Sequence, residues 1–249
     1  MGGTGALWRP IAASLEAQFD IFAPDQRGHG RSRPHPPASY SATTYGADVI
    51  ETWNTLSFSP SWVIAHSMGV RTACAAAHLA PQLVQGLVLI DLGLDGDSGG
   101  ELGDELSAFI AKLPTQFESR ALAREFIHGH CPDPSIGQYL LAVATPVQTA
   151  SGTGVLFPFD RQALVQTIHE AKSSNLRPWI EQFAKLHKPI LFLRGETSRV
   201  WSRNDFEAER SRFEKFPQLT FQEFEGTGHG LPFEKRSLFC ETVQKWIYS

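Results

Sequence analysis

Short apolar runs alternate with helical patterns along the first ninety residues, and this alternation is the feature that most limits the possible folds. Two runs, Trp62–Ala65 and Gly86–Ile90, are apolar almost throughout. Between them, residues 68–79 are rich in alanine and read as a helix. Nearly continuous apolar strands separated by helices are typical of a parallel sheet that is covered on both faces. The pattern therefore predicts an α/β fold with a mostly parallel, doubly wound sheet.

The rest of the chain continues this alternation at both ends and interrupts it in the middle. The further elements that the apolar spacing predicts are helices over residues 7–18, 45–56 and 237–248 and strands over residues 21–24, 189–193 and 219–224. Between residues 92 and 187 the strand signals disappear, and amphipathic segments are found instead over residues 106–113, 121–127, 136–144 and 161–171. We interpret residues 99–185 as a helical insertion in a core formed by residues 1–98 and 186–249.

Composition narrows the functional classes. With 249 residues, of which 42% are hydrophobic, the chain can bury one substantial core. Its 22 basic and 26 acidic residues form no long run of either sign, so it lacks the electrostatic footprint of a protein that binds nucleic acid or anionic membranes. No apolar stretch is long enough to cross a bilayer, and residues 1–5 carry no secretory pattern. We expect a soluble, cytoplasmic protein with a small-molecule substrate, and the oligomeric state stays open.

Neither a metal site nor a cofactor site is indicated. The three cysteines are odd in number, widely spaced and without a metal-type pair, which also argues against a disulfide framework. His128 and His130 lie close together, yet no further ligand stands at a usable spacing. The glycines within residues 2–5 follow no strand, which disfavours a nucleotide-binding loop. We expect no metal and no cofactor.

A serine lies at the junction of a buried strand and a helix, in the segment Ile64-Ala65-His66-Ser67-Met68-Gly69. On such a tight turn the hydroxyl projects clear of the sheet, and N–H groups at the start of the helix can stabilise an oxyanion. The turn needs small residues two before and two after the serine, and Ala65 and Gly69 meet this need. Taken alone, the segment fits a nucleophile and a simple helix N-cap equally well.

A histidine far downstream, His229, lies in the loop Gly226-Thr227-Gly228-His229-Gly230, between the last predicted strand and the last predicted helix. An imidazole there could reach over the carboxyl edge of the sheet and act as a general base toward Ser67. The alternative is a histidine in a surface loop. The chain order, serine and then histidine, each after a strand, favours the base.

Three motifs in this order resemble those of the α/β-hydrolase superfamily: Asp25–Ser32, Ala65–Gly69 and Gly226–His229. The resemblance covers the whole chain and implies the α/β-hydrolase fold, with the insertion as a helical lid. It also implies that Ser67 is the nucleophile and His229 the base. The backbone N–H of Met68 would then be one half of the oxyanion hole.

The same resemblance assigns structural roles to two further features, the turn over residues 27–32 and His66. The front of the chain departs from the family, which places two or three strands and a His-Gly turn ahead of the first helix. Residues 1–8 look like the tail of that turn. The missing strand would lie between residues 21–24 and 62–65, and a sheet without it leaves backbone groups unpaired. We therefore expect that this chain starts late, through truncation or a wrongly assigned start codon.

The acid that should orient His229 is a second departure. Members of the superfamily usually carry it three or four residues past the glycine that follows the fourth predicted strand, and this chain has Ser198 and Arg199 there. Glu196 comes one residue after that glycine, whereas Asp91 ends the preceding strand, where certain lipases hold the acid. We prefer Asp91, although it could simply cap the next turn, and keep Glu196 as the alternative. Weaker candidates are Asp95, Asp97 and Asp205.

These residues together predict a serine hydrolase that cleaves a small ester, thioester or related carbonyl compound through an acyl-enzyme. Carbon–carbon bond hydrolysis and haloperoxidase-like chemistry are alternatives that the same fold supports. A non-catalytic, hydrolase-like protein that binds a ligand is the alternative from another class, because the usual acid and the front strands are missing.

Overall fold

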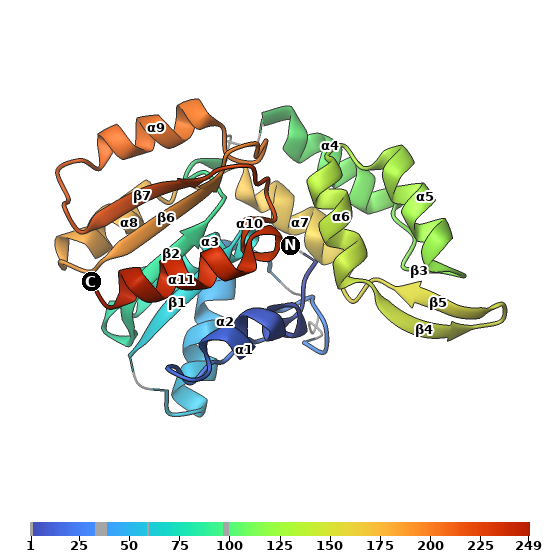
Figure 1. Ribbon diagram of the computed structural model, residues 1–249, viewed down its shortest axis with the longest axis horizontal. Helices are drawn as coiled ribbons and strands as arrows, with labels where there is room; N and C mark the ends of the chain where they lie inside the picture. Colours follow the sequence, from blue (N-terminus) through green and yellow to red (C-terminus); the bar gives the residue numbers. More distant parts are fainter. Residues whose placement is uncertain (1, 33–38, 59, 97–99) are drawn as a thin grey trace. The chain divides into compact units, whose positions relative to one another are not determined.

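The computed structural model describes residues 2–32, 39–58, 60–96 and 100–249, and the chain forms two compact units (Figure 1). The first unit comprises Met1–Ala38 and Gly100–His169. The second comprises Ser39–Gly99 and Glu170–Ser249. The first unit is thus assembled from two segments that lie more than sixty residues apart in the chain.

The second unit is built on a sheet of four parallel strands. They lie in the order β1 (Ser61–His66), β2 (Val84–Ile90), β6 (Ile190–Gly195) and β7 (Leu219–Phe224). All six residues of β6 are buried, and β2 is buried except at one position, as expected for the two central strands. The predicted α/β fold class is confirmed. Because the strands are parallel, their carboxyl ends meet at one edge of the sheet.

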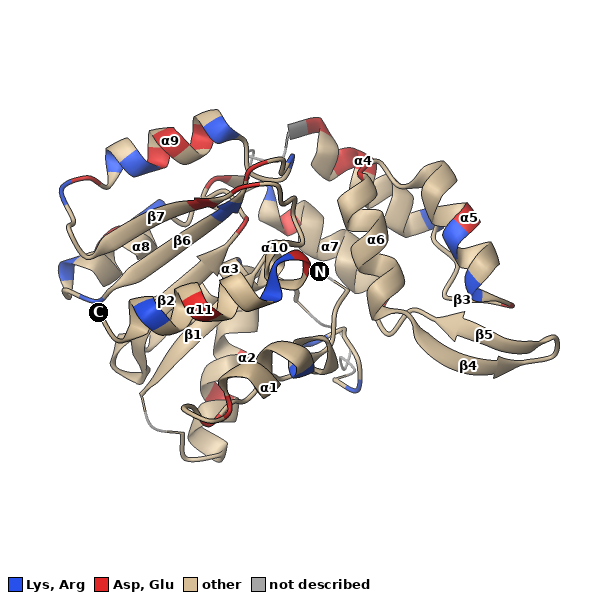
Figure 2. Cartoon of the chain, viewed as in Figure 1, with Lys and Arg blue, Asp and Glu red and all other residues tan. Residues whose placement is uncertain are grey.

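Helices cover both faces of this sheet. The described helices of the second unit are α2 (Ala42–Thr55), α3 (Met68–Leu79), η2 (Pro81–Leu83), α8 (Arg177–Lys185), α9 (Arg203–Arg212), α10 (Leu231–Glu234) and α11 (Arg236–Ile247). In Figure 1, α11 crosses the front of the sheet, with α3 and α8 behind it. The apolar core joins α3, α8 and α9 to the strands through Cys74, Phe183, Phe192 and Phe206. Charged residues colour α9 and α11 but neither β1 nor β2 (Figure 2).

Residues 21–24 were predicted to form a strand, and this prediction is wrong. They pair with no strand in the described part of the chain, and Ile21 and Phe22 are each 42% exposed. An apolar run becomes a strand only where a neighbour satisfies its N–H and C=O groups. The helix predicted just before it is shorter than expected, with a 3₁₀ turn, η1 (Gly5–Trp8), leading into α1 (Arg9–Leu15).

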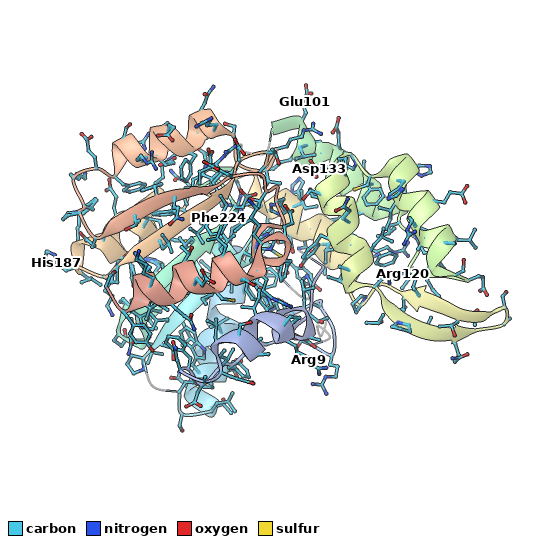
Figure 3. The ribbon with its side chains drawn as sticks, in the orientation of Figure 1. Arg9, Glu101, Arg120, Asp133, His187 and Phe224 are labelled. Atoms are coloured by element: carbon cyan, nitrogen blue, oxygen red, sulfur yellow. The ribbon has the colours of Figure 1, made fainter. Side chains whose placement is uncertain are left out.

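The first unit contains the amphipathic helices predicted from the sequence and also a small sheet that was not predicted. Its further helices are α4 (Gly100–Lys112), α5 (Arg120–His130), α6 (Pro134–Val143) and α7 (Arg161–Ala171), the last of which ends within the second unit. Asp133, labelled in Figure 3, caps α6 by accepting a hydrogen bond from the Ile136 N–H at 3.0 Å.

The small sheet of the first unit is antiparallel, with β3 (Gln116–Phe117), β5 (Gly152–Leu156) and β4 (Thr145–Thr149) in that order. Sequence analysis missed it because β4 has only five residues, none of them fully buried, and therefore lacks the apolar run that marks a strand. Pro146 fits in β4 because this strand lies at the edge. The signal of a hairpin in the sequence is a short polar stretch that ends in Gly152. In the structure this glycine has φ +122°, a conformation that glycine adopts readily.

Candidate active site

The strand β1 ends in a strained turn that carries Ser67. This residue has φ +56° and ψ −127°, a conformation that a side chain other than glycine seldom adopts. Its N–H donates to the Ile90 carbonyl at 2.9 Å, and its own carbonyl accepts from the Val70 N–H at 2.8 Å. Within this described stretch the hydroxyl makes no capping hydrogen bond to α3. The simple N-cap interpretation of Ser67 is therefore wrong, and its hydroxyl is directed elsewhere.

The histidine of the downstream loop meets this serine. His229 Nε2 lies 2.9 Å from Ser67 Oγ, and both side chains are buried. The loop follows β7 and precedes α10, so it leaves the sheet at the same edge as the end of β1. The structure thus brings Ser67 and His229 together, as the predicted role of His229 requires.

The other ring nitrogen of His229 faces a carboxylate. Asp91 Oδ2 lies 2.8 Å from His229 Nδ1, and Asp91 is fully buried at the end of β2. Two donors support this carboxylate, one from the last residue of β6 and one from the loop that follows: the Gly195 N–H donates to Oδ1 at 2.9 Å, and the Ser198 hydroxyl donates to Oδ2 at 2.5 Å. A buried carboxylate needs such partners, because burying a charge without them is costly.

Ser198 is the residue of this site whose contact the sequence analysis missed. It occupies the place at which the superfamily usually carries the acid, and that departure was the available signal. Its loop is fixed by Arg194, which is 3% exposed. The guanidinium donates to the carbonyls of Trp201 and Ser198, at 2.7 and 3.3 Å, and pairs with Glu223. The loop therefore holds the Ser198 hydroxyl against Asp91.

The remaining acidic candidates lie elsewhere. Glu196 is exposed, and its Oε2 accepts from the Gly226 N–H at 2.7 Å, so it binds the backbone of the histidine loop and not the ring. Asp95 pairs with Arg177, and Asp205 accepts from the hydroxyl of Ser202, the N-cap of α9. Asp97 lies outside the described residues.

The end of β6 and the histidine loop approach each other so closely that only glycine fits at position 195. A Cβ atom there would lie 2.1 Å from the Gly228 carbonyl oxygen. The same contact lets the N–H and hydroxyl of Thr197 both donate to the Thr227 carbonyl at 2.9 Å. The loop that carries His229 is thus fastened directly to the loop that supports Asp91.

Comparison with known proteins identifies the family. A model of the alpha/beta hydrolase fold matches residues 1–130, which is more than half of the chain. The chain belongs to the alpha/beta hydrolase family. Among its relatives is the 2-(acetamidomethylene)succinate hydrolase of Mesorhizobium japonicum, which is 29% identical over 79% of this chain and 68% of that protein. The sn-1-specific diacylglycerol lipase ABHD11 of Mus musculus is 26% identical over 91% of this chain and 71% of that protein.

Solved structures agree with this assignment. The crystal structure of E-2-(acetamidomethylene)succinate hydrolase matches with a TM-score of 0.80 and 25% identity, over 100% of this chain and 89% of that one. Relatives of this alpha/beta hydrolase are named as hydrolases, esterases and lipases, and the chain is accordingly an enzyme of the hydrolase class.

Three further properties concern the described residues of the hydrolase. In the part of the chain that the structure describes, no group of three or more His, Cys, Asp or Glu side chains could hold a metal ion. Burial raises the pKa of the Cys74 thiol to about 12, so this cysteine is not a nucleophile at neutral pH. No described helix is both long enough and apolar enough to cross a membrane.

The glycine-rich turn after Asp25 is fixed within the first unit. The Gly30 N–H donates to the Pro158 carbonyl at 2.6 Å, and the Asp160 N–H donates to the Gly28 carbonyl at 2.8 Å. The carboxylate of Asp25 accepts from two backbone N–H groups on either side, those of Gly5 and Arg31. These bonds satisfy the backbone of the turn, as in a loop with a structural role.

Proposed function

We propose that this alpha/beta hydrolase is a serine hydrolase in which Ser67 is the nucleophile, His229 the general base and Asp91 the orienting acid. The observation that carries the proposal is an unbroken chain of hydrogen-bond contacts. Ser67 Oγ lies 2.9 Å from His229 Nε2, and His229 Nδ1 lies 2.8 Å from Asp91 Oδ2. Because a carboxylate can only accept, Nδ1 carries the proton and Nε2 is left free to take one from the serine.

The reaction follows from this arrangement. His229 Nε2 takes the hydroxyl proton as Ser67 Oγ bonds to the substrate carbonyl carbon, and the carbonyl oxygen becomes an oxyanion. The N–H of Met68, the first residue of α3, lies at the positive end of the helix dipole and would donate to that oxyanion. The tetrahedral intermediate then expels the leaving group, which receives the proton from Nε2.

Water completes the cycle. His229 takes a proton from water, the hydroxide adds to the acyl carbon, and collapse of the second intermediate returns the proton to Ser67 Oγ as the acid leaves. Asp91 stays ionised throughout and stabilises the imidazolium that forms twice. The four groups named here carry the reaction, so the mechanism assigns no step to a metal or cofactor.

The substrate class follows from the same chemistry. The site attacks carbonyl carbon, and the relatives are named for 2-(acetamidomethylene)succinate and for diacylglycerol, both of which are carbonyl compounds. We propose a small ester, thioester or related carbonyl substrate, selected by the insertion that residues 99–185 were predicted to form. The proposal also places the enzyme in the cytoplasm. Its balanced charge argues against a nucleic-acid or membrane partner.

The non-catalytic alternative loses its main support. It rested on the missing acid and on the missing front strands. Asp91, 2.8 Å from His229 Nδ1, supports the catalytic proposal on the first of these two grounds.

Replacement of the nucleophile tests the proposal. Ser67→Ala should reduce hydrolysis of short-chain nitrophenyl esters by roughly 10⁴-fold or more, since the alanine cannot form an acyl-enzyme. It should also abolish labelling by a fluorophosphonate. Ser202→Ala, which removes the N-cap of α9, is the matched control and should keep both activity and label. Unchanged ester hydrolysis by folded Ser67→Ala would refute the proposal.

A further inference from the structure

The residue before the proposed nucleophile makes a contact that the mechanism has not used. His66 is the last residue of β1 and is 7% exposed. Its Nε2 lies 2.6 Å from the backbone carbonyl oxygen of His229. A carbonyl oxygen can only accept a hydrogen bond, so Nε2 of His66 must carry the proton and donate it.

The surroundings of His66 keep its ring neutral. The ring packs against the His229 ring, with centroids 4.7 Å apart, and against the edge of Phe233 at 5.7 Å. Burial, followed by repulsion from His229, lowers the pKa of His66 well below 6.5. A ring that does not protonate near neutral pH places no positive charge beside the imidazolium that forms on His229. His66 can thus act as a fixed, uncharged donor.

The neighbouring residues of the histidine loop are tied to other elements. The Thr227 carbonyl accepts a hydrogen bond from Thr197, and the Gly226 N–H donates one to Glu196. Thr197 and Glu196 both belong to the segment after β6. The N–H groups of Gly228 and Gly230 both donate to the carboxylate of one residue of α10, Glu234. These contacts fix the loop relative to β6 and α10, whereas the nucleophile lies between β1 and α3.

We propose that His66 is a positioning residue that fixes His229 relative to Ser67. The last residue of β1 and the residue after it hold the proposed base at two points: His66 at the backbone carbonyl and Ser67 at the ring. Because His66 and Ser67 are consecutive residues, the contact of His66 with the His229 backbone fixes the distance between Ser67 Oγ and His229 Nε2. This inference rests on the proposed function of Ser67 and His229. It concerns the rate of the chemical step and leaves substrate binding unchanged.

The reason for such a link is the steep dependence of rate on geometry. A displacement of about 1 Å in a catalytic group can reduce the rate by roughly 10²-fold. Glutamine can present an N–H donor at nearly the reach of histidine Nε2, whereas leucine fills the space without a donor. Asparagine keeps an amide but is too short to reach the carbonyl. These three side chains therefore separate the donor from the packing.

The experiment compares His66→Leu, His66→Gln and His66→Asn with the wild type on a short-chain nitrophenyl ester. We expect kcat to fall roughly tenfold or more in His66→Leu and His66→Asn, with KM within about twofold, and to recover to within about threefold in His66→Gln. His78→Leu makes the same replacement at the far end of α3, where His78 contacts Gln182, and should leave kcat and KM unchanged.

Titration of active sites with a fluorophosphonate, together with the thermal midpoint, corrects every rate for unfolded protein. If His66→Leu does not fold, the contrast between His66→Gln and His66→Asn decides. Wild-type kcat per titrated site in His66→Leu or His66→Asn would overturn the inference, as would a folded His66→Gln that is as slow as the other two. Such results leave the proposed function intact as long as Ser67→Ala remains inactive, so the two failures are distinguishable.

Discussion

The ends of β2 and β6 are adjacent, and both take part in the site around His229, but they contribute differently to it. The two strands pair in parallel, with Ile90 opposite Leu193, so the residues that follow them emerge side by side. The first residue after β2 is Asp91, the proposed acid, whose Oδ2 lies 2.8 Å from His229 Nδ1. The end of β6 supplies hydrogen-bond donors, Gly195 and Ser198, to that same carboxylate. The acid and its supporting donors have separate origins in the chain.

This difference suggests a general view of the site: what matters for orienting His229 is that a carboxylate lies beside its Nδ1, and not which strand carries that carboxylate. Asp91 reaches the place because its φ is +52°, a left-handed conformation that Asp tolerates better than most residues. Ser198 reaches nearly the same point from the other side, since its hydroxyl touches the oxygen that faces the imidazole. An acid at either strand end could serve His229, and the four predictions below test this view.

The largest effect is expected at the end of β2. Asp91→Asn puts an amide where the carboxylate was, and an amide donor toward Nδ1 favours the wrong tautomer of His229. We expect kcat for ester hydrolysis to fall by about 10⁴-fold with little change in KM. A variant that keeps more than a tenth of the wild-type kcat, with a wild-type thermal midpoint, would place the acid elsewhere.

The second-largest effect is expected when the acid is moved from the end of β2 to the loop after β6, which should restore part of the activity that is lost without Asp91. Asp91→Gly empties the place, and glycine adopts φ +52° without strain. Adding Ser198→Asp supplies a carboxylate that extends one bond farther than the serine. We expect the double variant to be roughly tenfold to a hundredfold faster than Asp91→Gly alone. A double variant no faster than the single one shows that the two strand ends are not interchangeable.

A smaller effect is expected from removing the support at the end of β6. Ser198→Ala leaves Asp91 Oδ2 with one donor fewer, and hydrogen bonds to a charged group contribute about 1.5–3 kcal/mol. If a part of that energy orients the carboxylate, kcat should fall roughly tenfold. The rate per fluorophosphonate-titrated site is the measurement, and Ser202→Ala is the control. A rate equal to that of the wild type would show that Ser198 contributes only to packing.

The smallest effect is expected at Glu196, the alternative acid. Glu196→Gln keeps an oxygen that can accept from the Gly226 N–H. Since Glu196 contacts the backbone of the histidine loop and not the ring, we expect kcat within about twofold of the wild type. Exposed substitutions of this kind usually change the free energy of unfolding by less than about 0.5 kcal/mol, so the thermal midpoint should also change little. A loss comparable to that of Asp91→Asn would reverse the assignment of the two strand ends.

Regular elements with strong apolar periodicity could be predicted, and weak or unpartnered ones could not. The strands over 86–90 and 189–193 were recognisable because central strands of a parallel sheet are apolar on both faces. The strands over 62–65 and 219–224 lie at the edges of the described sheet, and enough apolar residues remained in them to show the pattern. The run over 21–24 has the same appearance but no strand beside it, and the hairpin of β4 and β5 is too polar to stand out. The local sequence pattern indicates which segments favour the strand conformation, but a strand forms only where a neighbouring strand can pair with it.

The sequence by itself determined the α/β class, the order of serine and histidine along the chain and the small residues that the turn at Ser67 requires. Only the tertiary structure decided that Asp91 and not Glu196 reaches His229, that Ser198 supports that carboxylate, and that His66 holds the backbone of the histidine loop. The physical reason is that hydrogen bonds between side chains depend on angles and on distances of about 3 Å. In this site, residues more than a hundred positions apart reach such distances because parallel strands bring their ends to one edge of the sheet.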